Sequence, residues 1–190
     1  MSHPYDRAYW DDGTKGYHLY RDFPSHWRIV KIILEKKPEN VLDVGGARGY
    51  IVHKLEANGI RAVCMDISEN GYHCRATDSF VLHDARTVPW PFKDKEFDLA
   101  ISTAFMEHLT EPEIEIVIKE MARVSKRGYH TITFEKTAID IDVTHRSFHS
   151  HEAWMNKFKA YVPDYPVEIM TKEEAAILER TPIELPPSDN

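Results

Sequence analysis

The amino-acid sequence predicts an α/β fold with a doubly wound, mostly parallel sheet. The first indication is an alternation of short apolar runs, typical of strands buried on both faces, with segments of helical periodicity. The second is a glycine-rich turn, residues 45–49, which follows one such run and precedes apolar residues at helical spacing. The third is that several runs end in a polar residue, at the sheet edge where such folds bind ligands.

The first half of the chain is predicted to contain two helices and three strands. A helix is expected over 25–36, capped by Ser25 and stopped by Pro38. A second helix follows the glycine-rich turn and should end at Gly59. The connection 67–78 shows no amphipathic pattern, so we expect a loop or a single turn in place of a crossover helix. The strands are expected at 40–44, 60–65 and 79–83.

The second half contains the clearest helix of the chain, over 111–126. Thr110 and Glu113 are placed to form a capping box at its start, and Gly128 is expected to end it. A further helix should begin after Ser150, which can cap it. The strands are expected at 97–102, 129–134 and 167–170.

Four successive strands are each followed by, or end in, a polar side chain. These residues are Asp43, Asp66, Asp84 and Ser102. Because the carboxyl ends of parallel strands meet at one edge of a sheet, we expect these side chains to lie along a single ligand-binding edge. Turn chemistry would explain one aspartate at such a place, but a series after a glycine-rich turn favours a site.

With 190 residues, the chain is expected to form a single domain over 1–190. Within it, 24–170 would be the α/β core, and 171–190 would be a C-terminal helix and tail. Residues 1–23 are crowded with aromatic side chains. This N-terminal arm either packs statically on the core or forms a lid over a ligand pocket.

Composition narrows the possible partners and location. A net charge of −7 argues against broad electrostatic binding to nucleic acid. No apolar run approaches the ~20 residues that a membrane span requires, and the first residues do not resemble a secretory signal. Cys64 and Cys74 match no disulfide framework and no common zinc pattern, so we expect a cytoplasmic protein with free thiols. The oligomeric state cannot be derived from the sequence.

Four stretches, in this order and spacing, resemble the motifs of class I S-adenosylmethionine-dependent methyltransferases, of the small-molecule, type 11-like kind. The stretches are 41–49, 64–68, 82–92 and 97–109. The resemblance implies a Rossmann-like sheet of the seven-stranded type, shortened at its C-terminal end. It also implies S-adenosylmethionine as the cofactor and a small molecule as the substrate.

The resemblance assigns one group of residues to the methionine end of the cofactor. Gly45, Gly46 and Gly49 would let the backbone run against the methionine portion. Asp43 would meet the cofactor's ammonium group directly or through water. The backbone around Ser102 would border the same end.

A second group is assigned to the nucleoside end. Asp66, about twenty residues after the turn, would accept hydrogen bonds from both ribose hydroxyls. Ile67 would pack on the adenine face, Asp84 would accept from the adenine amino group, and the Ala85 N–H would donate to a ring nitrogen. One departure is Ala47, where the family often has glycine, so the turn must tolerate a methyl group.

The predicted function is methyl transfer to an unidentified small-molecule acceptor. One alternative is an NAD(P)-dependent oxidoreductase, which shares the sheet and Asp66. The imperfect dinucleotide fingerprint and Asp43, which would face a pyrophosphate, disfavour it. The other alternative is a non-catalytic protein that binds S-adenosylmethionine without turnover.

His145 is the candidate catalytic residue, because it follows the fifth strand and can accept a proton near neutral pH. Asp142 would orient its ring; the alternative is that His145 only ties down its loop. The pair 107–108 is expected to pack at the start of the next helix rather than to act in catalysis. No metal is predicted, since His145, His149 and His151 match no tight ligand spacing.

Overall fold

The structure is a computed structural model, and it describes residues 5, 9–10, 21–135, 142–171, 174 and 177. Most of the predicted N-terminal arm and of the predicted C-terminal helix and tail therefore lie outside the described residues. The helices are α2 (Pro24–Glu35), α3 (Tyr50–Ala57), α4 (Glu69–His73), η1 (Met106–His108), α5 (Glu111–Val124) and α6 (His151–Tyr161). The strands are β1 (Asn40–Val44), β2 (Arg61–Asp66), β3 (Phe80–Leu82), β4 (Phe97–Thr103), β5 (Ser125–Thr131) and β6 (Val167–Ile169).

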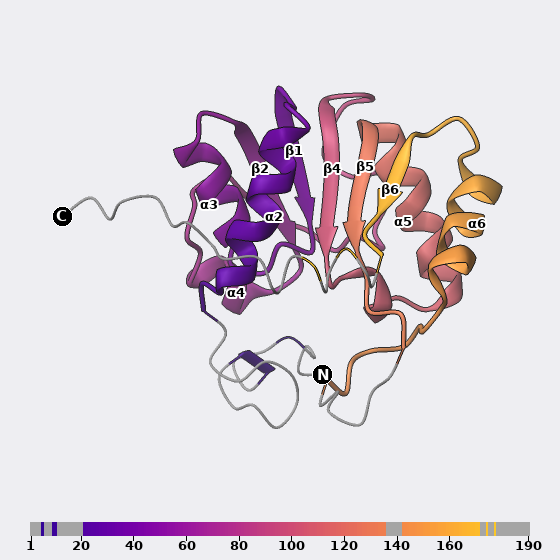
Figure 1. Ribbon diagram of the computed structural model, residues 1–190. Coiled ribbons are helices and arrows are strands. Elements are labelled where there is room, and N and C mark those ends of the chain that lie inside the picture. Colours follow the sequence, from indigo (N-terminus) through magenta and orange to yellow (C-terminus); the bar gives the residue numbers. More distant parts are fainter. Residues whose placement is uncertain are drawn as a thin grey trace.

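The described strands form one parallel sheet in the order β3-β2-β1-β4-β5-β6. The order reverses between β1 and β4, where Val41 lies opposite Leu99. The arrowheads of β1, β4 and β5 point to the same edge, and the piece that holds residues 9–10 lies beyond that edge (Figure 1). The α/β prediction is confirmed, with six parallel strands over the described residues.

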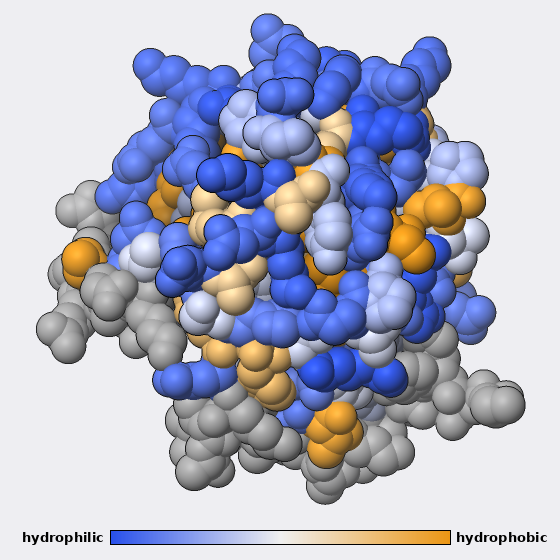
Figure 2. Space-filling model, turned by 90° about the vertical axis from the view of Figure 1, so that its right-hand side faces the viewer, coloured by the Kyte–Doolittle hydropathy of each residue, from blue (hydrophilic) through white to orange (hydrophobic). Residues whose placement is uncertain are grey.

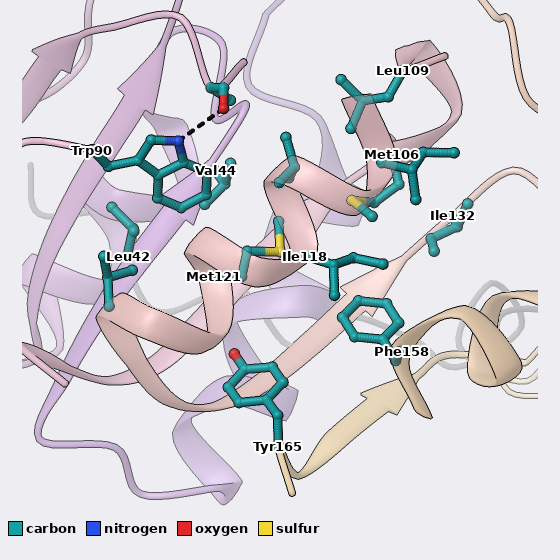
Figure 3. Packing of buried hydrophobic residues seen from close by; sticks show 14 of the residues in the cluster. Leu42, Val44, Trp90, Met106, Leu109, Ile118, Met121, Ile132, Phe158 and Tyr165 are labelled. Carbon is teal, nitrogen blue, oxygen red and sulfur yellow. Dashed lines mark hydrogen bonds between the residues drawn. The ribbon is translucent and has the colours of Figure 1, made fainter. Parts of the chain in front are cut away.

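The core lies on both faces of the sheet, because neighbouring residues of a strand point to opposite faces. In β1, Val41 packs in the layer of α2 and α3, whereas Leu42 and Val44 pack in the layer of α5 and α6. All three side chains are fully buried, which stabilises the fold by roughly 1.5–3 kcal/mol each. Figure 3 shows the second layer, in which Ile118 and Met121 of α5 belong to one buried cluster with Phe158 of α6.

Trp90 anchors the loop after β3 to this core. Its indole Nε1 donates to the carbonyl of Ala85 over 2.8 Å, as Figure 3 shows, and its backbone N–H donates to the Glu120 carboxylate over 2.7 Å. Since Glu120 lies on α5, the loop is fixed to a helix far along the chain. This contact holds Ala85 in place at the carboxyl edge of the sheet.

The end of α5 and the start of β5 differ from the prediction. The helix ends at Val124 and Gly128 does not cap it; Ser125 already begins β5. Gly128 lies inside the strand, where an added Cβ would come within 2.7 Å of His130 Nε2 and 3.0 Å of the Tyr165 hydroxyl. Close packing therefore explains this glycine, and the predicted strand 129–134 starts four residues too late.

The start of α2 also differs, whereas two other local predictions are confirmed. The N-cap is Phe23, whose N–H donates to His26 Nδ1, so the cap predicted at Ser25 is wrong. Proline in the first turn of α2 favours this earlier start. Glu113 accepts from the N–H of Thr110, as expected of the capping box. The connection after β2 is indeed a single short turn, α4.

The face that carries α6 is largely hydrophilic, with apolar residues scattered over it (Figure 2). This distribution is usual for the outer faces of helices that cover a sheet. Within the described ranges, no helix has the length and apolar character needed to cross a membrane.

Candidate functional site

A cavity of about 300 Å³ opens at the carboxyl edge of the sheet, on both sides of the point where the strand order reverses. Ligands of doubly wound folds bind at this position. The lining comes from the turn after β1, the ends of β2 to β4, η1 and two distant segments. The lining residues are Tyr5, Tyr9, Trp10, Gly45, Ala47, Met65, Asp66, Ile67, His83, Asp84, Ala85, Arg86, Thr103, Ala104, Phe105, His108, Leu109 and Arg146.

The structure brings the predicted nucleoside-end residues together in this lining. They are Asp66, Ile67, Asp84 and Ala85, joined by one predicted methionine-end residue, Gly45. The other predicted residues are absent from the described lining and lie beneath or beside it: Asp43, Gly46, Gly49, Ser102 and His145.

Asp66 ties the glycine-rich turn to the end of β2. Its Oδ2 accepts from the N–H of Ala47 over 2.9 Å, and its Oδ1 accepts from the N–H of Ser68 over 2.8 Å. Ala47 has a φ of 55°, so the turn holds this residue in the left-handed region despite its methyl group. Burial raises the pKa of Asp66 to about 6, although the hydrogen bonds from Ser68 and Ala47 oppose the shift.

Asp43 lies under the turn rather than in the cavity. Its side chain is 1% exposed, and within the described part of the chain neither carboxylate oxygen has a hydrogen-bond partner. An added Cβ on Gly46 would lie 2.7 Å from Asp43 Oδ2, so the carboxylate supports the turn closely from beneath. Burial, reinforced by the charge of Asp66, raises the pKa of Asp43 to about 7.

Phe105 explains why Gly45 must be glycine. Gly45 has a φ of 73°, and an added Cβ would lie 2.3 Å from the Phe105 ring. The ring itself lines the cavity, so the turn and the residue after β4 form one wall. Packing within the protein therefore accounts for this glycine before any ligand is considered.

Ser102 lies one residue before the cavity wall. Its Oγ is 2.9 Å from His130 Nδ1, inside the buried layer next to α6. The following residues, Thr103 and Ala104, do line the cavity. Ser102 therefore belongs to a strand whose end borders the cavity, but its own side chain faces the core.

Asp84 already has a charged partner at the cavity wall. Arg86 donates to both of its oxygens, at 2.8 Å and 2.7 Å, and also reaches Glu113 over 3.3 Å. Each carboxylate oxygen has further acceptor capacity, so a ligand amino group can share Asp84 with Arg86.

The described aromatic residues of the N-terminus form part of the wall. Tyr9 is 1% exposed and Trp10 is 4% exposed. The Trp10 indole donates to Ser68 Oγ over 2.9 Å, and the Tyr9 hydroxyl donates to Asp142 Oδ2 over 2.7 Å. Tyr9 and Trp10 therefore both pack on the core and line the cavity.

His108, which was not predicted to act in the site, reaches the cavity, whereas His145 lies behind it. The two rings are 4.7 Å apart, and His145 Nε2 is 3.8 Å from Asp142 Oδ2. Burial lowers the pKa of His108 to about 4. Parallel pairing of β4 with β5 is the signal that places the segments after these strands together.

His149 and His151 lie apart from this group. His149 Nε2 contacts Glu111 over 2.5 Å, and His151 Nε2 is 3.0 Å from the carbonyl of Ile169. These contacts agree with their expected place around the start of α6.

Comparison with known proteins gives one family model, described as a methyltransferase domain, which matches residues 42–133. Ajmaline N-methyltransferase of Rauvolfia serpentina is 31% identical over 129 residues, which is 62% of this chain and 43% of that protein. Norajmaline N-methyltransferase of the same plant is 33% identical over 104 residues, which is 49% of this chain and 34% of that protein. The chain thus spans less than half the length of these curated relatives.

Solved structures show the same fold. A complex of the Haloferax volcanii Trm112 methyltransferase activator with a methyltransferase aligns with a TM-score of 0.58 and 23% identity, over 72% of this chain and 68% of that one. A SAM-dependent methyltransferase from Archaeoglobus fulgidus aligns with a TM-score of 0.58 and 21% identity, over the same shares.

Proposed function

The chain belongs to the class I S-adenosylmethionine-dependent methyltransferases, and from this membership we propose that it transfers a methyl group from S-adenosylmethionine to a small-molecule acceptor. One observation carries the proposal: separate motifs converge on a single cavity at the carboxyl edge of the sheet. Its volume, about 300 Å³, is at the lower end of the range usual for ligand pockets.

The residues present suit this cofactor. Asp66 and Ile67 would hold the ribose and one adenine face, and Asp84 with the Ala85 N–H would hold the adenine edge. Gly45 and Ala104 would border the methionine end. Asp43, Gly46, Gly49 and Ser102 would act indirectly, by shaping the turn and the strand ends that support it.

The Asp43 carboxylate, which has no hydrogen-bond partner among the described residues, favours a positively charged ligand group over an anionic one. A buried carboxylate is costly unless a cation or hydrogen-bond donor compensates it. The cofactor's ammonium group would supply this compensation through the turn, whereas a pyrophosphate would add repulsion. This favours S-adenosylmethionine over NAD(P), and hence over the oxidoreductase alternative.

Positioning is the catalytic device that the cavity supports. The cofactor, when bound, supplies an already activated methyl group. Tyr5, Tyr9 and Trp10 would exclude water and align the acceptor. His108 is the imidazole that the acceptor would meet, since His145 lies behind it, so we place His145 in a supporting role rather than as the general base.

We propose a small molecule as the substrate and the cytoplasm as the location. The two free cysteines, one buried and one exposed, support a reducing compartment. The net charge of −7 argues against broad binding to nucleic acid. One structural neighbour is a complex with an activator protein. The activity assay should therefore also be run with a cell extract that could supply a protein partner.

The test is transfer of labelled methyl from S-adenosylmethionine to a metabolite extract, followed by identification of labelled products. We expect a labelled small molecule with the wild-type protein, and much less of it with Asp66→Asn when the cofactor is kept below saturation. Binding of S-adenosylhomocysteine without any labelled product, with or without added extract, would favour the non-catalytic alternative.

A further inference from the structure

Three metal-ligating side chains meet beside the cavity, at the ends of two paired strands. His108 follows β4 through η1, and Asp142 and His145 come from the segment after β5. One ring nitrogen of each histidine and one carboxylate oxygen of Asp142 all lie within 4.8 Å of one another. Among the residues that the structure describes, this is the one such group of three.

We propose that His108, Asp142 and His145 bind one divalent transition-metal ion, such as Zn²⁺. Two imidazoles and a carboxylate favour such an ion over Mg²⁺ or Ca²⁺, which prefer oxygen ligands alone. Ligand atoms at about 2 Å from one ion lie roughly 3–4 Å apart. His145 Nε2 and Asp142 Oδ2 are already 3.8 Å apart, so binding requires a contraction of about 1 Å elsewhere in the group.

Neighbouring groups hold the proposed ligands in place. Thr144 donates its backbone N–H and its hydroxyl to Asp142 Oδ1, over 2.8 Å and 2.6 Å. The Thr144 hydroxyl also lies 2.8 Å from His108 Nδ1, and Tyr9 donates to Asp142 Oδ2. Such outer hydrogen bonds orient metal ligands and raise their affinity.

The group is sheltered from solvent but adjoins the cavity. The side chains of Asp142 and His145 are each 10% exposed, which limits competition from water. His108 and Tyr9 line the cavity, so an ion held here would lie directly behind its wall.

The role of this ion rests on the proposed function. A cation at this end of the cavity favours an acceptor that carries a hydroxyl, phenol or carboxylate oxygen, and it makes a nearby hydroxyl more acidic. The proton of that hydroxyl would pass to solvent water before the oxygen attacks the cofactor's methyl group, so no side-chain base would be needed. The proposal thus narrows the acceptor to a molecule with an ionisable oxygen near the reacting atom.

The experiment is calorimetric titration of ZnCl₂ into the full chain after treatment with EDTA and dialysis. We expect one equivalent to bind, and His145→Ala and Asp142→Asn to weaken binding by at least tenfold. His149→Ala is the matched control, because His149 contacts Glu111 instead, and it should bind as the wild type does. All proteins carry Cys74→Ser, since an exposed thiol also binds zinc.

Titration of S-adenosylhomocysteine into the same samples separates the two proposals and reports whether each variant is folded. The metal site is overturned if the wild type shows no saturable binding at one equivalent. It is equally overturned if folded His145→Ala and Asp142→Asn bind zinc as the wild type does. Zinc binding without any adenosyl ligand binding would leave the metal site standing and contradict the proposed function.

Discussion

Asp43 is the residue at which stability and function oppose each other. Its pKa is raised to about 7 by burial, above its ordinary value of 3.8. Between these values the folded state holds a proton that the unfolded state has lost, so this group destabilises the fold as pH rises. A bound cation would reverse the penalty, which is what a cofactor ammonium above the turn would do.

Replacing Asp43 by Asn should therefore have a pH-dependent effect on the apo protein. The quantity to follow is the free energy of unfolding of Asp43→Asn minus that of the wild type. This difference should rise between pH 4 and pH 7, by at most about 1.4 kcal/mol per pH unit, and then level off. Urea unfolding at several pH values measures this difference. A difference that stays constant over this pH range would contradict the raised pKa of Asp43.

At the scale of elements, the short helix α4 supports the turn that lines the cavity. An added Cβ on Gly71 would lie 2.6 Å from the carbonyl oxygen of Ala47, and backbone cannot yield as a side-chain tip can. Ala47 in turn donates to Asp66. A change on α4 is thereby transmitted to the wall of the cavity.

Gly71→Ala should lower the free energy of unfolding by about 1–3 kcal/mol and also weaken binding of S-adenosylhomocysteine. Gly59→Ala is the matched control: its φ is 79° and nothing lies within 4 Å, so it should cost about 1–2 kcal/mol without changing affinity. Thermal unfolding and calorimetry distinguish the two. Equal affinities of both variants would contradict a link between α4 and the site.

The fluorescence of Trp10 should report ligand binding, because this residue lines the cavity. By contrast, Trp90 and Trp154 are buried in the core and Trp27 lies on α2. Tryptophan emission should change when S-adenosylhomocysteine is added to the wild type, and this response should vanish in Trp10→Phe. Trp27→Phe should keep it. A response that survives in Trp10→Phe would place the ligand away from this wall.

Most elements could be predicted from the sequence because their signals are local. The capping box at Thr110 and the missing amphipathic pattern before β3 each depend on a few neighbouring residues. Gly128 could not be interpreted this way. An added Cβ there would meet His130 and Tyr165, and Tyr165 approaches only after the chain has returned through α6.

The site was predictable in part for the same reason. The strand-end rule found Asp66 and Asp84, because it locates an edge from sequence alone. It does not say which way a side chain points, so it also selected Asp43 and Ser102, which face buried layers. His108, in η1 just after β4, reaches the cavity although its position at the start of a helix favoured a packing role.

At the scale of the whole molecule, the central claim is that the carboxyl edge of this sheet binds an adenosyl cofactor. All the strand ends that build the cavity come from residues within the stretch that matches the methyltransferase domain family. Tyr5, Tyr9, Trp10 and Arg146 complete the wall from outside that stretch. The binding site is therefore a property of the tertiary fold rather than of one motif.

The measurement that tests this claim most directly is calorimetric titration of S-adenosylhomocysteine and of NAD into the purified chain. We predict saturable binding of the adenosyl ligand at one equivalent, a loss of roughly 1–3 kcal/mol of binding free energy in Asp66→Asn, and no binding of NAD. Tight binding of NAD, with no heat from S-adenosylhomocysteine, would contradict the account.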